Sequence, residues 1–548
     1  MKQLLLLLSI AFLFSCKETS SNASTEEATQ TLNDSTVQER EYAVLDSKVL
    51  TDETLWKSFD FEVKMFTETK YDQLKPFIFE KTIPEIQQAV AQGQLTYEEL
   101  VLFYLSRIKK YDRNNDLSLN SVIALNPKVL DQARELDANR ADDFDPYSIY
   151  GMPILLKDNI NAADMPTTAG AVVFEDNDTG DAFITQKLKE HGALILGKAN
   201  LSEWAYFFCG DCPSGYSAVG GQTLNPYGRK IHDTGGSSSG SGVAMAANFA
   251  VAAVGSETSG SILSPSSSNS VVGLKPTIGL LSRGGIIPIS STLDTPGPMT
   301  RNVIDNAILL QAMTGLDEDD AAAVNLNAAS TDYVNGLKDV VASAYLSEKR
   351  LGYYTNYDDT LYLQAVEALR EAGAILIPIE RPEVDLPQFT RVLNLDMQKD
   401  LPAYIANYGS KNLAVKDLED ITGFNKKDSL IRMPYGQKLL YGVLADSASA
   451  EEFTAIKDTL ERNGRRFFDE PMKVNDLDAV LSINNYMAGY AAVAKYPAIT
   501  VPMGYQEDNR PMGLTFIAPT LSEAQLLELA YAYEQISKMR KTPTNFEE

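Results

Sequence analysis

Residues 235–242 have the sequence GGSSSGSG, and they are followed by the small apolar run VAMAA at 243–247 and the strand-like run FAVAAVGSETSGS at 249–261. Glycine and serine in this proportion are typical of a flexible linker. A linker seldom joins a buried helix directly, however, and the apolar run predicts such a helix. The stretch has no GxxxxGK[ST] pattern of a phosphate-binding loop. It therefore indicates either a linker or a functional turn inside the core.

The strand-like run ends in a second glycine and serine turn, GSETSGSI at 255–262. A hydroxyl at a tight turn with small neighbours is open to a substrate carbonyl, and successive backbone N–H groups can point toward a developing oxyanion. Serine is a weak nucleophile at its ordinary pKa and needs a base. The turn is therefore a candidate for a serine nucleophile whose base lies elsewhere in the sequence.

Lys157 is the best candidate for that base. The chain has two histidines, His191 and His232, and neither lies in the context of a catalytic triad. Serine hydrolases can use a lysine instead. Lys157 ends the apolar stretch GMPILLK at 151–157, where burial would disfavour its charged form. A lysine after a strand is more often a surface residue, and on this residue alone that alternative stays open.

Composition limits the class of protein and the partners. Hydrophobic residues make up 44% of the 548, which predicts a mostly globular chain. The 74 acidic residues outnumber the 48 basic ones and give a formal net charge of −26. This charge repels nucleic acid and anionic lipid surfaces, and no Lys/Arg-rich run offsets it locally. We therefore expect no nucleic acid partner.

The N-terminus has the pattern of an export signal. A short basic start is followed by an apolar run from Leu4 to Phe14, which is too short to span a bilayer. Leu13-Phe14-Ser15-Cys16 resembles the bacterial lipobox, in which the signal is cut before a lipidated cysteine. We expect residues 1–15 to be a lipoprotein signal peptide and Cys16 to anchor an exported protein to a bacterial membrane, on the periplasmic or cell-surface side. The alternative is a plain signal peptide with an incidental cysteine.

The segment after Cys16 predicts a tether. Residues 17–42 are polar, acidic and nearly free of large apolar side chains, so they cannot bury enough surface to offset the entropy of ordering. We expect residues 16–75 to be the lipidated cysteine and a flexible acidic tether leading into the fold, and residues 76–545 to be the catalytic domain. The two other cysteines, Cys209 and Cys212, predict a local disulfide or two inert thiols, because zinc would need four N/S ligands.

Helical and strand patterns alternate along the globular part. Thr96-Tyr97-Glu98-Glu99 predicts a capping box at the start of a helix, and apolar strand-like runs precede helical runs at 120–141 and again at 351–380. Alternation of this kind predicts an α/β layered fold. No Gly/Pro-rich linker divides the chain into domains. Residues 316–440 carry few glycines and many helix formers, so we expect a helical lobe there that covers the central sheet.

The ordered set GMPILLKDN, GGSSSGSG and GSETSGSILSP resembles the amidase-signature family. The lysine of that family's first motif corresponds to Lys157, the first serine of its GGSS motif to Ser237, and the serine of its [DE]-x-x-G-S-I motif to Ser261. Further matching stretches are PTTAG at 166–170, GKANLSEWA at 197–205, GLKPTIGLLSRGGIIPIS at 273–290, LDTPGPMTR at 293–301 and YPAITVPMG at 496–504. The resemblance covers residues 80 to 540, and GGQTLNPY, GSET and SRGGIIPISSTLDTPGPM are most similar to the peptide-amidase branch.

The resemblance implies a single domain with a mixed, twisted central sheet covered by helices on both faces. It also implies a Ser-Ser-Lys triad of Ser261, Ser237 and Lys157, with a cis Gly236–Ser237 peptide bond. The implied oxyanion donors are the backbone N–H groups of Thr258, Ser259, Gly260 and Ser261. The substrate would be a small or peptide-like carboxamide, hydrolysed without cofactor or metal. Ser259 and Leu263 differ from the residues that are common in the family at these positions. These differences bear on which substrate is bound more than on the reaction that is catalysed.

Two other classes of function remain beside this hypothesis. One is an amidotransferase A-type subunit, which works in a cytoplasmic complex on charged tRNA. The export signal and the net charge of −26 argue against this hypothesis. The other is a non-catalytic binding lipoprotein on the same fold, against which the retention of all three triad positions argues. The sequence leaves a homodimer open and does not identify the physiological amide.

Overall fold

The computed structural model describes residues 39–113, 115–140, 145–325 and 332–547. A compact unit begins at Glu39. The predicted signal peptide and Cys16 lie outside the described residues. Among the residues described, no helix is long and apolar enough to cross a membrane.

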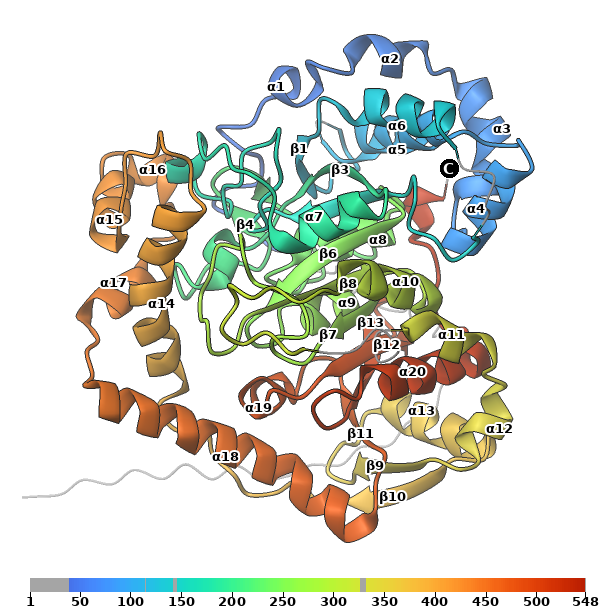
Figure 1. Ribbon diagram of the computed structural model, residues 1–548, viewed down its shortest axis with the longest axis vertical. Coiled ribbons are helices and arrows are strands. Elements are labelled where there is room, and N and C mark those ends of the chain that lie inside the picture. The colour runs from blue at the N-terminus through green and yellow to red at the C-terminus, as the bar shows by residue number, and fades with distance from the viewer. Residues whose placement is uncertain (1–38, 114, 141–144, 326–331, 548) are drawn as a thin grey trace, which may run out of the picture. The chain divides into compact units, whose positions relative to one another are not determined.

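One large mixed sheet organises the unit (Figure 1). Its strands follow the order β1 (Val122–Leu125), β3 (Leu194–Ala199), β2 (Pro153–Lys157), β6 (Ala252–Glu257), β8 (Thr295–Thr300), β7 (Val272–Lys275), β12 (Ala498–Tyr505), β13 (Pro511–Ile517), β11 (Ala479–Ile483), β9 (Arg350–Tyr354) and β10 (Ile375–Ile379). The strands β3, β2 and β6 run parallel, β6 to β11 pair antiparallel, and β11, β9 and β10 are again parallel. A separate two-stranded sheet consists of β4 (Tyr216–Ser217) and β5 (Gly221–Gln222).

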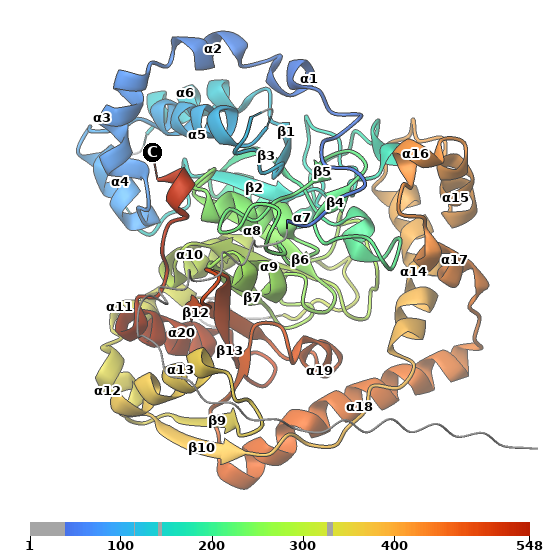
Figure 2. The ribbon, with the colours of Figure 1, turned by 180° about the vertical axis from the view of Figure 1, so that it is seen from behind.

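Helices cover both faces of the large sheet, as expected for a mixed α/β fold. All residues of β2, β3, β6 and β8 are buried, because helices pack on either side of them. One face carries α8 (Ser239–Ala246) and α9 (Leu263–Ser268), and the other carries α7 (Phe183–Glu190), α10 (Val303–Met313) and α20 (Glu523–Ser537) (Figure 2). The helix predicted from 243–247 is α8, and every one of its residues is buried.

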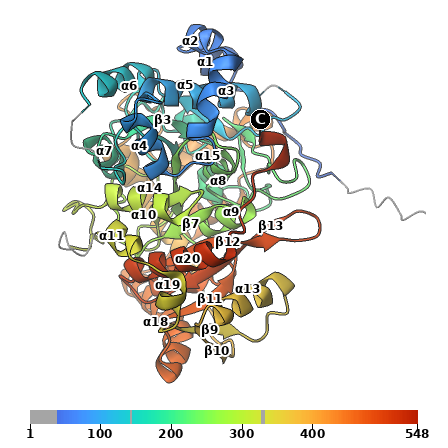
Figure 3. The same ribbon diagram turned by 90° about the vertical axis from the view of Figure 1, so that its right-hand side faces the viewer.

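Smaller helices extend these layers. The N-terminal group comprises α1 (Asp52–Trp56), α2 (Asp60–Met65), α3 (Glu68–Ile78), α4 (Ile83–Ala91), α5 (Tyr97–Tyr111) and α6 (Val129–Ala138). The capping box predicted for α5 is confirmed, because the side chains of Thr96 and Glu99 each accept a hydrogen bond from the other's backbone N–H. The helices α11 (Tyr333–Lys338), α12 (Ala342–Leu346) and α13 (Thr360–Glu371) lie near α20 and the β9–β10 end of the sheet (Figure 3).

The helical lobe differs from the one expected at 316–440. Within that range, β9, α13 and β10 form a strand–helix–strand unit that extends the sheet. The lobe instead consists of α14 (Phe389–Asn407), α15 (Leu418–Lys426), α16 (Ser429–Arg432), α17 (Lys438–Ala445) and α18 (Ala450–Asn475). Figure 1 shows α14 to α17 standing beside the sheet, with α18 running from them toward β9 and β10. The strand and helix predicted within 351–380 are confirmed as β9 and α13, so the expectation of a helical lobe is wrong for that part of the range.

The fold also begins earlier than residue 76. Residues 39–75 form part of the compact unit and contain α1, α2 and most of α3. Their apolar side chains are spaced widely, but Trp56, Phe59, Tyr71 and Leu74 are buried in the main core. A few large aromatic residues therefore order a segment whose average composition predicts a tether.

The C-terminal segment closes the unit against the N-terminal helices, and Figures 1 to 3 show the C-terminus beside α3 to α5. Arg107 on α5 donates to the carbonyl of Phe546 at 2.7 Å. Arg540 donates to the carboxylate of Glu80 at 2.6 and 3.0 Å, and to the carbonyl of Ser270 at 2.8 Å. Burial alone would raise the pKa of Glu80, but the Arg540 guanidinium lowers it to about 2.

We predict that Arg540→Gln destabilises the fold by about 2 kcal/mol at pH 7, because it leaves the half-buried carboxylate of Glu80 without its cation. The folded-state pKa of Glu80, about 2, lies below the ordinary 4.5. The contribution of the pair is therefore complete above pH 4.5 and is lost as the pH falls toward 2. Urea unfolding at several pH values measures the difference, which should shrink below pH 4.5. The exposed pair Arg466–Glu470 provides the control, and Arg466→Gln should change stability by less than ~0.5 kcal/mol.

Candidate active site

The three predicted catalytic residues meet at one edge of the sheet. Strands β2 and β6 are parallel neighbours, so their carboxyl ends lie side by side. Lys157 is the last residue of β2, and the turn that contains Ser261 follows β6 directly. The loop that contains Ser237 leads into α8, which packs on β2 and β6. Each residue is thus held at the end of a buried element.

Lys157 is fully buried, and its ammonium position has three oxygen neighbours. Its Nζ lies 2.7 Å from Ser237 Oγ, 3.0 Å from the carbonyl oxygen of Ser256 and 3.0 Å from Ser256 Oγ. Burial lowers the pKa of Lys157 to about 7, and the negative charges of Asp294 and Glu257 oppose this shift only in part. A substantial fraction of the lysine is therefore neutral near pH 7, and a neutral amine has a lone pair that can accept a proton.

Ser237 is held from both sides by backbone hydrogen bonds. The Gly236–Ser237 peptide bond is cis, as the resemblance implied. The carbonyl of Ser237 accepts from the N–H of Ser202 at 3.0 Å, and the N–H of Ser238 donates to the carbonyl of Ser261 at 3.1 Å. The two glycine and serine turns therefore contact each other directly. A Cβ atom at Gly236 would lie 2.6 Å from Ser202 Oγ, so a larger residue there would displace that hydroxyl.

The turn after β6 is organised by the side chain of Glu257. Its carboxylate accepts from the N–H groups of Gly260 at 2.6 Å, Ile262 at 2.7 Å and Leu263 at 3.0 Å. Ser261, between these donors, is 9% exposed. The carboxylate of Glu257 therefore fixes the backbone of the turn on both sides of Ser261.

This arrangement changes the set of expected oxyanion donors. The N–H of Gly260 donates to Glu257 and is not free for a substrate, contrary to the expectation. The N–H groups of Thr258, Ser259 and Ser261 make no hydrogen bond to other described residues. The acidic residue of the GSETSGSI motif thus has a backbone role that its pattern did not reveal.

Sequence reasoning missed three residues that touch this group. Ser256 contacts Lys157 with both its carbonyl and its hydroxyl, and Asn159 Nδ2 donates to Ser256 Oγ at 2.9 Å. Asp294 Oδ1 accepts from Thr258 Oγ1 at 2.5 Å. Asn159, Ser256 and Asp294 belong to the motifs GMPILLKDN, GSET and LDTPGPMTR, so their positions were marked, but nothing in the sequence assigned them partners.

The two remaining cysteines lie in the loop that precedes β4. Cys209 and Cys212 form a disulfide, which was one of the two expected arrangements. The carbonyl of the neighbouring Phe208 accepts from the N–H of Leu439, so the disulfide loop contacts the helical lobe. Within the described parts of the chain, no group of three His, Cys, Asp or Glu side chains could hold a metal ion.

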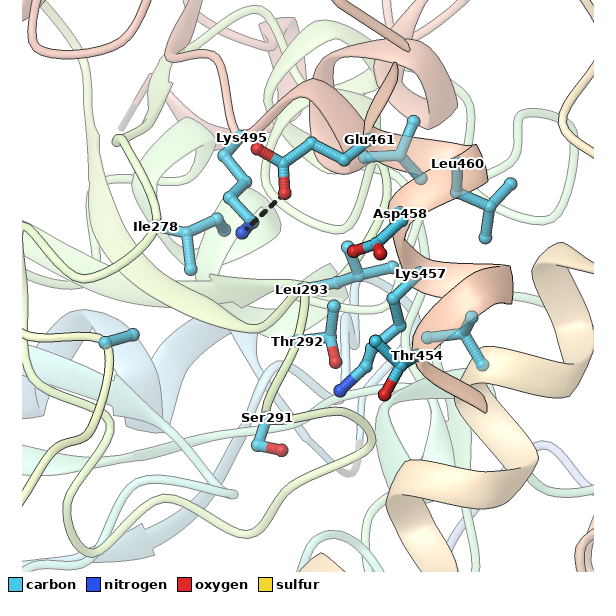
Figure 4. A pocket seen from close by; sticks show the side chains of 13 residues that line it. Ile278, Ser291, Thr292, Leu293, Thr454, Lys457, Asp458, Leu460, Glu461 and Lys495 are labelled. Atoms are coloured by element: carbon cyan, nitrogen blue, oxygen red, sulfur yellow. Dashed lines mark ion pairs between the residues drawn. The ribbon is translucent and has the colours of Figure 1, made fainter. Parts of the chain in front are cut away.

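A cavity of about 440 Å³ lies at the same edge of the sheet, between the core and α18 (Figure 4). Its core wall includes Ile278, just after β7, and residues 291–293, just before β8. Strand β8 pairs with both β6 and β7, so the loop of Ile278 follows a strand that lies two places in the sheet from the strand before Ser261. In Figure 4 the side chain of Lys457 on α18 points toward Thr292 and Thr454. Lys495 forms an ion pair with Glu461 at 2.8 Å on another wall.

The chain matches proteins of known family along most of its length. The family model described as Amidase matches residues 99–527. The solved structure of native peptide amidase from Stenotrophomonas maltophilia is 38% identical, covers 85% of this chain and 98% of its own, and superimposes with a TM-score of 0.79.

Two named relatives are similar along the sequence. A probable amidase of Arabidopsis thaliana is 34% identical over 85% of this chain and 92% of its own length. A glutamyl-tRNA(Gln) amidotransferase subunit of Gloeobacter violaceus is 30% identical over 84% of this chain and 97% of its own length. The family match, the two amidases and the shared fold lead to one conclusion: the chain belongs to the amidase family and is a hydrolase that acts on amides.

Proposed function

We propose that the chain hydrolyses a small or peptide-like carboxamide through an acyl-enzyme on Ser261, with Ser237 and Lys157 as its proton relay. The observation that carries this proposal is the 2.7 Å contact between Lys157 Nζ and Ser237 Oγ inside a fully buried site. The carbonyl of Ser256 can only accept a hydrogen bond from the amine. A neutral Lys157 can therefore donate to that carbonyl while its lone pair accepts from the Ser237 hydroxyl.

The reaction has two halves. Ser261 Oγ attacks the carbonyl carbon while its proton passes to Ser237 Oγ and the proton of Ser237 passes to Lys157 Nζ. The negative charge on the carbonyl oxygen meets the unengaged N–H groups of Thr258, Ser259 and Ser261. Collapse breaks the C–N bond, and the leaving amine or ammonia takes its proton back through the relay. Water then attacks the ester along the same path, which releases the acid and regenerates Ser261.

An amidotransferase subunit is the second candidate, because one of the named relatives is such a subunit. Its substrate would be charged tRNA, and the net charge of −26 opposes binding of a polyanion. Turnover of simple amides by the purified chain alone supports the hydrolase. Labelling of Ser261 by a fluorophosphonate would argue against the non-catalytic binding role that the sequence left open.

We predict distinct effects for the three relay residues. Ser261→Ala should abolish acyl-enzyme formation and fluorophosphonate labelling, because the attacking oxygen is gone. Ser237→Ala and Lys157→Ala should each lower kcat by roughly 10³-fold or more, and the double variant should cost little beyond the worse single change, because the residues act as one unit. Mass spectrometry of the labelled chain and steady-state kinetics measure both effects. Full labelling of Ser261→Ala would assign the nucleophile to another residue.

The pH dependence tests the lysine. Only the neutral amine can accept a proton, and burial lowers its pKa to about 7, so kcat/KM should rise with pH along a limb centred near 7. Lys157→Ala should flatten that limb. A limb unchanged in Lys157→Ala would show that another group is the base.

The cavity beside α18 supports a polar, peptide-like acyl group. Lys457, Asp458 and Thr292 line it, and neither Lys457 nor Asp458 has an ion-pair partner among the described residues. An aliphatic chain in this space would lie against the charged groups of Lys457 and Asp458, although Asp458 is exposed to water and Lys457 Nζ also lies 4.4 Å from the ring centroid of Phe453. A peptide that extends from the scissile amide could instead place polar side chains beside these groups.

We therefore predict that short peptide amides exceed long-chain acyl amides in kcat/KM. The double variant Lys457→Met/Asp458→Leu should shift this ratio toward apolar amides by about tenfold, because it removes the polar lining. The exposed pair on the same helix provides a matched control, and Arg466→Met/Glu470→Leu should leave the ratio unchanged. A wild-type preference for long acyl amides would contradict the proposed substrate class.

Lipid anchoring at Cys16 remains a separate proposal, supported by the lipobox-like sequence Leu13-Phe14-Ser15-Cys16. We predict that the mature protein begins at Cys16 and enters the detergent phase on phase separation, and that Cys16→Ser moves it to the aqueous phase. N-terminal mass spectrometry identifies the processed end. A wild-type protein that stays in the aqueous phase and retains Lys2 would contradict the anchor.

A further inference from the structure

Asp294 joins the turn that precedes β8 to the loop that precedes Ser261. Its Oδ1 accepts from Thr258 Oγ1 at 2.5 Å, and its Oδ2 accepts from the N–H groups of Ile289 at 2.8 Å and Ser290 at 2.9 Å. Every partner is a donor, so the geometry suits the ionised carboxylate. Its burial raises the pKa of Asp294, and these three hydrogen bonds oppose the shift.

We propose that Asp294 is a positioning residue for amide hydrolysis, which holds the oxyanion loop through Thr258 and places a fixed negative charge beside the Lys157–Ser237 relay. This inference rests on the proposed function. Thr258 is the first of the oxyanion donors and has its hydroxyl tied to Asp294. Its backbone N–H can therefore keep its direction without any bond from that N–H to the protein.

The turn that carries Asp294 is itself anchored to the helical lobe. Ser290 Oγ donates to Asp396 on α14 at 2.5 Å, and the N–H of Ser291 donates to Asp400 on the same helix at 2.6 Å. The carboxylate of Asp294 thus connects the oxyanion loop to a turn fixed from the other side. A displacement of about 1 Å at an oxyanion donor can lower a rate by ~10²-fold, so such a connection bears directly on catalysis.

The strand register places Asp294 near the relay, because its neighbour Thr295 pairs with Glu257, the residue after the Ser256 that binds Lys157. Asp294 and Glu257 both raise the pKa of Lys157 against the effect of its burial. The other charged groups around the site are paired or face other partners. Asp158 is bound to Lys198 at 3.0 Å, and Arg283 is bound to Asp320. Lys275 lies near Glu257, and Asp400 lies near Asp294. Loss of the Asp294 charge should therefore move the titration of Lys157 to lower pH.

Two substitutions separate these roles. Asp294→Asn keeps the shape and can still bond Thr258, Ile289 and Ser290, but it removes the charge. Thr258→Val keeps the charge and removes the hydroxyl. We expect the limb of kcat/KM in Asp294→Asn to shift by ~0.5–1 pH unit toward lower pH. In Thr258→Val we expect kcat to fall at least tenfold, with KM and the position of the limb unchanged, and Thr258→Ser should restore most of the loss.

The controls distinguish this inference from the proposed function. Fluorophosphonate labelling of Ser261 and loss of the limb in Lys157→Ala test the relay independently of Asp294. With both intact, a limb at the wild-type pH in Asp294→Asn overturns the electrostatic role, and wild-type kcat in Thr258→Val overturns the positioning role. If Asp294→Asn does not fold by circular dichroism, the pair Thr258→Val and Thr258→Ser still decides whether the contact matters. An equal loss in both Thr258 variants also overturns the positioning role.

Discussion

The site depends on one constraint, the removal of the Lys157 amine from water. An ammonium group loses hydration when it is buried, and this loss lowers the pKa of Lys157 to about 7. Hydroxyl and carbonyl oxygens replace part of the lost hydration of the Lys157 amine, and no carboxylate is bound to it. Its hydrogen-bond partners among the described residues are Ser237 and Ser256. Burial lowers the pKa of Lys198 as well, and Asp158, whose carboxylate lies 3.0 Å from Lys198 Nζ, opposes that shift. Two buried lysines thus lie near the ends of neighbouring strands, and among the described residues Lys198 has an ion-pair partner whereas Lys157 has hydroxyl and carbonyl partners.

The acids near the site have structural roles that limit their effect on the lysine. Glu257 directs its carboxylate at three backbone N–H groups and shapes the turn that presents Ser261. Asp294 likewise uses both oxygens on donors from two loops. Because each negative charge is stabilised by several dipoles, neither acid needs the ammonium of Lys157 as its partner. The same hydrogen bonds that build the turn therefore leave Lys157, the proposed base, without a carboxylate bound to its amine.

Sequence patterns predicted the elements of the core well, and they predicted side-chain partners poorly. The run GMPILLK and the run FAVAAV give two apolar strands, and parallel pairing alone brings their carboxyl ends together. The contact between Lys157 and Ser237 followed from the resemblance to a family rather than from the residues. The bond from Gly260 to Glu257 could not be predicted, because a carboxylate may turn toward solvent, a lysine or its own backbone with similar local sequence. The start of the fold at Glu39 was not predicted for a different reason. A few buried aromatic side chains order this segment, although most of its residues are polar.

The helical lobe touches the core on both sides of the site, which separates the chemistry from the choice of substrate. On one side Leu439 of α17 donates to Phe208 beside the disulfide, and on the other side Asp396 of α14 accepts from Ser290. The proposed relay residues all come from the core strands and their loops, whereas α18 contributes the charged wall of the cavity. Substitutions on the lobe can therefore alter the lining of the proposed substrate space without moving Lys157 or Ser237, because those side chains are held by β2, β6 and the start of α8. The turn 289–294 belongs to both parts, since it binds α14 through Ser290 and the loop before Ser261 through Asp294.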